Sequence, residues 1–90
     1  MFDYDLTDEL KAIIKRLNKK DKKLSLMIAK KVKEIINNDS ESIDRYKNLR
    51  YDLKDKKRVH IGKHFVLCFK VNKVSNFILF TDFDHHDNVY

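Results

Sequence analysis

The first third of the chain has the apolar pattern of a short strand followed by two helices. Residues 2–6 alternate apolar and acidic side chains, which predicts a half-buried strand. Thr7 is a favourable N-cap, and the apolar side chains of residues 10–17 fall on one helical face. Asp21 is a second N-cap candidate, and residues 24–36 carry the apolar stripe of a longer helix. Because the link is short, the two helices are expected to form an antiparallel hairpin.

The second half of the chain has the pattern of three strands. A polar break at residues 37–40 precedes residues 41–46, whose weak pattern is typical of a helical turn. Strand-like runs follow at Lys57 to Ile61, Phe65 to Val71 and Phe77 to Asp82, separated by a tight turn at Gly62 and Lys63 and a loop at residues 72–76. Both alternating sets of side chains in the last two runs are mostly apolar, as in strands that are covered on both faces.

These elements predict an α+β fold with the order β-α-α-β-β-β in one domain of residues 1–90. The expected architecture is a small antiparallel sheet with the helical hairpin packed on one face. The other apolar face would be left for a partner or a terminal tail.

The charge of the chain favours an anionic partner. Lys and Arg number 20 against 14 Asp and Glu, which gives a net charge of +6. Positive charge favours polyanions because binding releases counterions from phosphates. Lysine-rich surfaces are also common in thermophilic proteins, so charge alone leaves that alternative open.

Several features indicate a cytoplasmic protein that does not enter a membrane. No apolar run approaches the roughly 20 residues that a membrane span needs. Residues 1–5 lack the basic and apolar regions of a secretion signal. The single cysteine, Cys68, cannot form an internal disulfide and fits a reducing cytosol. Its place in the middle of a predicted strand indicates a buried, inert thiol.

All four histidines lie in the last third of the chain, on or beside the predicted strands: His60, His64, His85 and His86. Histidine titrates closest to neutral pH, so such a group on a basic protein suggests proton transfer on an anionic substrate such as RNA. The usual Cys-x-x-Cys and His-x-x-x-His spacings of metal sites are absent, and His85 and His86 would diverge on an extended strand. We therefore expect neither a metal site nor another cofactor.

Four segments of the last half carry a resemblance to a known family. Residues 49–57 look like its basic loop, residues 58–62 like its core strand and turn, residues 65–71 like its next strand, and residues 85–90 like its catalytic tail. With the order of elements, these segments resemble the RelE superfamily of toxin–antitoxin ribonucleases. The resemblance covers essentially the whole chain, although in the two helices it is only architectural.

The catalytic residues of the RelE type are only partly matched. That type cleaves RNA with Lys, Arg and Tyr side chains. Its tail tyrosine matches Tyr90, but its two arginines would fall near Val66 and Asp84. An arginine-based mechanism therefore cannot operate here unchanged.

The histidines resemble those of the YafQ type within the same superfamily. A strand histidine of that type matches His60, and its tail histidine matches His86. Its further histidine and its aspartate would fall near Lys47 and His64, where the residues differ.

The resemblance implies a ribosome-dependent endoribonuclease that cuts mRNA in the A site without a metal ion. A ribose 2′-hydroxyl would attack the adjacent phosphate, with His60 and His86 as the acid–base pair and either role open to each. Arg58 could stabilise the developing charge, and Tyr90 could orient or stack on a base. His85 is expected to be structural, turned inward or toward a partner.

A basic group before and within the first strand of the hairpin is expected to contact RNA, although such residues are also common in solvated loops. Its members are Lys47, Arg50, Lys54, Lys56 and Lys57, with His64 as a possible helper.

The expected partners are mRNA, the 30S ribosomal A site and a cognate antitoxin. The antitoxin would be small, acidic and RelB-like, folding as it wraps the basic surface to form a hetero-oligomer. Two alternatives stay open. One is a non-enzymatic toxin that inhibits gyrase, like ParE, and the other is a degenerate toxin that only binds its antitoxin.

Overall fold

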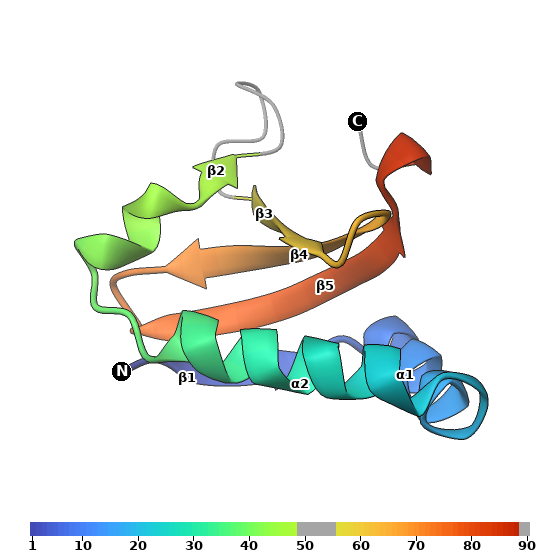
Figure 1. Ribbon diagram of the computed structural model, residues 1–90. Helices are drawn as coiled ribbons and strands as arrows, with labels where there is room; N and C mark the ends of the chain where they lie inside the picture. Colours follow the sequence, from blue (N-terminus) through green and yellow to red (C-terminus); the bar gives the residue numbers. More distant parts are fainter. Residues whose placement is uncertain (49–55, 89–90) are drawn as a thin grey trace.

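The computed structural model describes residues 1–48 and 56–88, and it shows two helices packed against one face of a sheet (Figure 1). This arrangement confirms the α+β fold. None of the helices in these residues is long and apolar enough to cross a bilayer. In chain order the elements are β1 (Asp3–Leu6), α1 (Asp8–Lys20), α2 (Lys22–Ile36), the 3-10 helix η1 (Ser42–Arg45), β2 (Lys47–Asn48), β3 (Lys56–Ile61), β4 (Phe65–Asn72), β5 (Phe77–His85) and the 3-10 helix η2 (His86–Asn88).

The five strands follow the order β1-β5-β4-β3-β2. The pairs from β2 to β5 are antiparallel as expected, but β1 lies parallel to β5 at the edge, so the sheet is mixed. The two-residue strand β2 was not predicted, because a segment this short has no period-two pattern. The helical turn expected at residues 41–46 is confirmed as η1.

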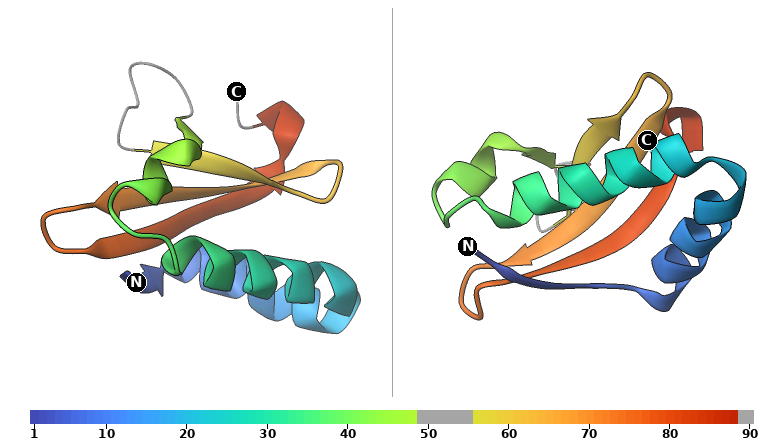
Figure 2. Two further views of the ribbon diagram at one scale, coloured as in Figure 1. Left: turned by 60° about the vertical axis from the view of Figure 1, so that its left-hand side comes forward. Right: turned by 60° about the horizontal axis from the view of Figure 1, so that its bottom comes forward.

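The two helices begin at the predicted N-caps. The Thr7 hydroxyl accepts a hydrogen bond from the Leu10 amide at 3.3 Å, and the Asp21 carboxylate accepts one from the Leu24 amide at 3.1 Å. Asp21 is also the only residue between α1 and α2, so the chain folds back at once (Figure 2). A capping side chain of this kind typically contributes about 1 kcal/mol to helix stability.

The main core lies between the helices and the sheet. Its centre consists of fully buried apolar side chains, each of which contributes roughly 1.5–3 kcal/mol on burial. They include Leu10, Ile28 and Ile35 from the helices and Leu67, Phe69, Ile78 and Phe80 from the strands. This packing confirms that the apolar stripes of both helices are core.

The opposite face of the sheet combines a buried centre with charged edges. On the middle strand β4, Val66 and Cys68 are 0% and 1% exposed. Val66 lies between His60 on β3 and Asp84 on β5 in the register. Directly paired residues point to the same face of a sheet, so histidine and carboxylate side chains flank this apolar centre.

A β-bulge changes the direction of every side chain in the second half of β5. Cys68 pairs with Asp82, but the next residue, Phe69, pairs with Phe80, so Thr81 is an extra residue on β5. One extra residue reverses the alternation of a strand. Phe80 and His85 therefore both belong to the helix-facing side, although their positions differ by an odd number. The strand also continues to His85, three residues beyond its predicted end.

Candidate functional site

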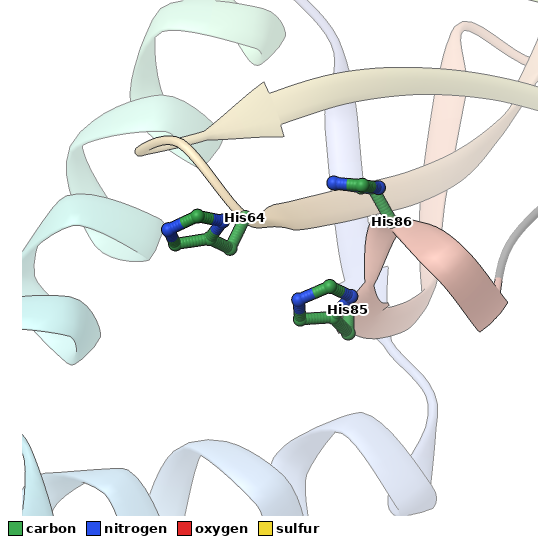
Figure 3. A group of neighbouring side chains, drawn as sticks. All are labelled: His64, His85 and His86. Atoms are coloured by element: carbon green, nitrogen blue, oxygen red, sulfur yellow. The ribbon is translucent and has the colours of Figure 1, made fainter.

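Three of the four histidines meet at the end of the sheet (Figure 3). His64 lies in the turn between β3 and β4, His85 ends β5, and His86 begins η2. One ring nitrogen from each residue lies within 4.8 Å of those of the other two. The His86 amide donates a hydrogen bond to the His64 carbonyl at 2.8 Å, so backbone pairing holds the two segments together.

The rings of this histidine cluster (His64, His85 and His86) continue into an aromatic row. The His64 and His85 rings are nearly parallel at 7°, with centroids 5.9 Å apart, and the His85 and His86 centroids are 4.8 Å apart. His85 also meets the Phe65 ring edge-on at 5.9 Å, and Phe65 stacks on Phe83 at 5.1 Å. Phe65 and Phe83 therefore connect the cluster to the core between the sheet and the helices.

The carboxylates of Asp84 and Asp87 contact the C-terminal segment that carries His85 and His86. Asp87 places its two oxygens 3.0 Å from Nδ1 of His86 and 3.4 Å from Nδ1 of His85. The Asp84 carboxylate accepts hydrogen bonds from the His85 amide at 2.7 Å and from the Asn88 side chain at 3.2 Å. Asp84, near the end of β5, therefore links the end of the strand to the Asn88 side chain of η2.

His60 belongs to a different part of the surface from the cluster. Its neighbours Val59 and Ile61 pack toward the helices, so His60 and Arg58 point to the opposite face, where His60 is exposed. The 3-10 helix η2 stands on that same side, away from α1 and α2 (Figures 1 and 2). His60 is two strands away from Asp84, a Cα separation of roughly 10 Å at about 4.8 Å per strand. His60 and η2 therefore border one face, although His60 is not part of the cluster.

Comparison with known proteins identifies the family. No family model matches the chain, and no solved structure matches it. A Methanocaldococcus jannaschii protein named "Putative toxin RelE4" is 46% identical over 90 residues, covering 100% of this chain and 92% of that protein. The chain belongs to the RelE toxin family. A Methanosarcina mazei relative named "Uncharacterized protein" is 40% identical over the full length of both chains. The resemblance seen in the sequence is thus confirmed at the level of the family.

The positions that lack the RelE arginines have structural roles in this RelE-family toxin. Val66 is fully buried in the middle strand, and the anionic Asp84 side chain accepts hydrogen bonds from the His85 amide and the Asn88 side chain. Neither side chain is available to stabilise a phosphate. Positive charge on this face comes instead from the neighbouring strand, where Arg58 lies two residues before His60.

The basic residues expected to bind RNA have different environments. Lys47 is exposed on β2 and pairs with Arg58 in the register. Lys56 is paired with Asp82 at 2.6 Å. Lys57 is 8% exposed, and its ammonium donates hydrogen bonds to the Tyr46 carbonyl at 3.1 Å and the Asn48 side chain at 3.2 Å. Lys57 therefore holds β2 and η1 in place, while Arg50, Lys54 and Tyr90 lie outside the described residues.

A pocket beside the cluster is lined by two cationic side chains, Arg16 and Lys20, that were not among the predicted site residues. It has a volume of about 390 Å³ and lies between α1 and the end of the sheet, next to the Phe65–Phe83 stack. Its lining comprises Ile13, Arg16, Leu17, Lys20, Phe65, Phe83 and Asp84. The i, i+4 spacing of Arg16 and Lys20 was the available signal, since it places both cations on one side of the helix.

On an extended strand, the side chains of His85 and His86 were expected to diverge. Instead the strand ends at His85, η2 starts at His86, and the two rings lie with centroids 4.8 Å apart.

Cys68 is buried as expected, and burial raises the pKa of its thiol to about 11. At neutral pH it is therefore a thiol and a poor nucleophile.

Proposed function

We propose that this RelE-family toxin is an endoribonuclease that cuts mRNA in the ribosomal A site and is neutralised by a cognate antitoxin. The observation that supports this most is the arrangement of one face of the sheet. Exposed His60 and neighbouring Arg58 lie on β3, and η2 with His86 rises on the same side (Figure 2). We propose that RNA bound across this face places a backbone phosphate within reach of the His60 and His86 imidazoles and the Arg58 guanidinium.

Cleavage would proceed by attack of the ribose 2′-hydroxyl on the adjacent phosphorus. One imidazole takes the 2′-hydroxyl proton, and the other gives a proton to the departing 5′-oxygen. The products are a 2′,3′-cyclic phosphate and a 5′-hydroxyl. Each positioned acid or base typically contributes 10²–10⁴-fold to the rate. Arg58 would stabilise the extra negative charge that develops on the phosphate in the transition state.

Binding of RNA would use the positive charge around this face. Lys47 is exposed beside Arg58, and His64 is exposed at the end of the sheet. Arg50, Lys54 and Tyr90 are proposed as further contacts on the strength of the family resemblance. The net charge of +6 also suits an acidic antitoxin, which would form a hetero-oligomer with the toxin.

Primer extension on mRNA translated by ribosomes tests this function. Wild-type protein is expected to give cuts at A-site codons, and His60→Ala and His86→Ala are each expected to lower the cleavage rate at least about 100-fold. Lys33→Ala is a matched control, because Lys33 is exposed on α2. It should cleave like the wild type.

The same variants separate the alternatives. Growth arrest that survives both histidine changes while mRNA stays intact would refute the nuclease and indicate a non-enzymatic toxin. Absence of any growth arrest from the wild-type chain, expressed without its antitoxin, would indicate a degenerate toxin.

A further inference from the structure

The histidine cluster has the composition of a transition-metal site. Three imidazoles converge from two segments 21 positions apart, and their ring nitrogens lie within 4.8 Å of one another (Figure 3). Imidazole is a preferred ligand of zinc, copper, nickel and cobalt, whereas calcium and magnesium prefer oxygen ligands. Three imidazole ligands therefore favour zinc, copper, nickel or cobalt over calcium and magnesium.

We propose that His64, His85 and His86 bind one divalent transition-metal ion of the zinc type. In a tetrahedral site with Zn–N bonds of about 2.05 Å, neighbouring nitrogens are about 3.3 Å apart. The widest separation in the cluster would have to close by roughly 1.5 Å. Rotation of the His64 side chain can bring its ring closer to the other two, because the residue is exposed in a turn rather than packed in the core.

The surroundings of the cluster already contain the outer groups of a metal site. Metal-binding histidines usually donate the N–H of the second ring nitrogen to a carboxylate or carbonyl. Here the Asp87 carboxylate contacts Nδ1 of both His86 and His85, which leaves Nε2 of each ring for the ion. The contact at 3.0 Å is the stronger of the two.

The protonation of His85 must be compatible with this assignment. Its Nδ1 also accepts a hydrogen bond from the Asp87 amide at 3.3 Å, which requires the proton to be on Nε2. The carboxylate contact requires the proton on Nδ1 instead. Binding of a metal at Nε2 would select the second form, in which the ring donates to Asp87.

Three histidine ligands leave one coordination position for water or an anion. Such an open position distinguishes catalytic and exchangeable sites from closed structural ones. The side chains of His85 and His86 are 40% and 36% exposed, so an ion can reach the cluster from solvent. The backbone hydrogen bond between His86 and His64 fixes the two segments before the ion arrives.

Titration of untagged, metal-free protein with Co²⁺ tests the site without RNA or ribosomes. The wild type is expected to bind one ion per chain with the strong visible absorption of four-coordinate Co²⁺, and Zn²⁺ should displace it. His64→Ala and His85→Ala are each expected to weaken binding at least about 100-fold. Asp87→Asn should weaken it about 10–100-fold, as changes to outer groups do.

His60→Ala is the matched control, because it removes a histidine outside the cluster and should leave the affinity unchanged. Circular dichroism checks that each variant is folded, and His64 is the safest position because it is exposed. Equal affinity in the wild type and His64→Ala, or no binding at 1 mM Co²⁺ by the wild type, would overturn the proposal. Neither result depends on whether the protein cleaves RNA.

Discussion

Replacement of Lys57 by methionine tests whether this lysine serves the fold rather than RNA binding. The side chain is 8% exposed, and its ammonium donates to the Tyr46 carbonyl and the Asn48 side chain at 3.1 and 3.2 Å. Asp44 lies 3.8 Å away but is more than half exposed, so that ion pair contributes little. Methionine keeps the apolar stem and removes the two hydrogen bonds.

The expected loss of stability follows from these contacts. A hydrogen bond from a charged donor contributes about 1.5–3 kcal/mol, and its loss leaves an acceptor without its partner. Removal of the ammonium also relieves part of the cost of burying a charge, which offsets some of this loss. We expect the free energy of unfolding to fall by about 2 kcal/mol. In a domain of this size the midpoint of thermal unfolding should fall by about 10 °C.

Urea unfolding followed by circular dichroism measures the effect, with Lys47→Met as the matched control. Lys47 is exposed on β2, so its replacement should change stability by less than about 0.5 kcal/mol. Lys47→Met should instead weaken mRNA cleavage, if the proposed function holds. Unchanged stability of Lys57→Met would refute the structural role, and a loss of RNA affinity in the folded variant would restore the original expectation for this residue.

Three further predictions concern acid stability, cysteine reactivity and metal inhibition. Burial raises the pKa of Asp82, but the ion pair and hydrogen bond with Lys56 outweigh it, so the pKa is lowered from 3.8. The ionised Asp82 carboxylate therefore stabilises the folded protein above pH 3.8. This stabilisation is lost as the pH falls through the lower pKa that Asp82 has in the folded state. The stability difference between the wild type and Asp82→Asn should therefore shrink below that pH, and a constant difference would contradict this. Because burial raises the pKa of Cys68 to about 11, iodoacetamide should label it at pH 8 only after urea unfolding, and fast labelling of native protein would refute its burial. Zn²⁺ should inhibit mRNA cleavage by the wild type, since a metal-bound His86 cannot transfer a proton, and EDTA should reverse the effect. His64→Ala should resist this inhibition, and equal sensitivity would place the inhibitory ion elsewhere.

Local features of the sequence were sufficient to predict most elements and the family. Thr7 and Asp21 were recognisable as caps because capping depends on one side chain and the next three residues. The helical stripes and the strand pairs from β3 to β5 follow from periodicity within short windows. Motifs near His60 and His86 indicated the RelE family, which the relatives confirm.

The tertiary structure decided the features that depend on pairing between distant segments. The bulge at Thr81 reverses which face the end of β5 presents, and it turns His85 toward the aromatic row. Lys57 and Lys47 look alike in the sequence, but only one is buried under η1 and β2. His64 meets His85 and His86 because β4 and β5 pair along their full length. Composition and spacing along the chain do not determine such a meeting point, because it depends on register, and one extra residue changes the register of a strand.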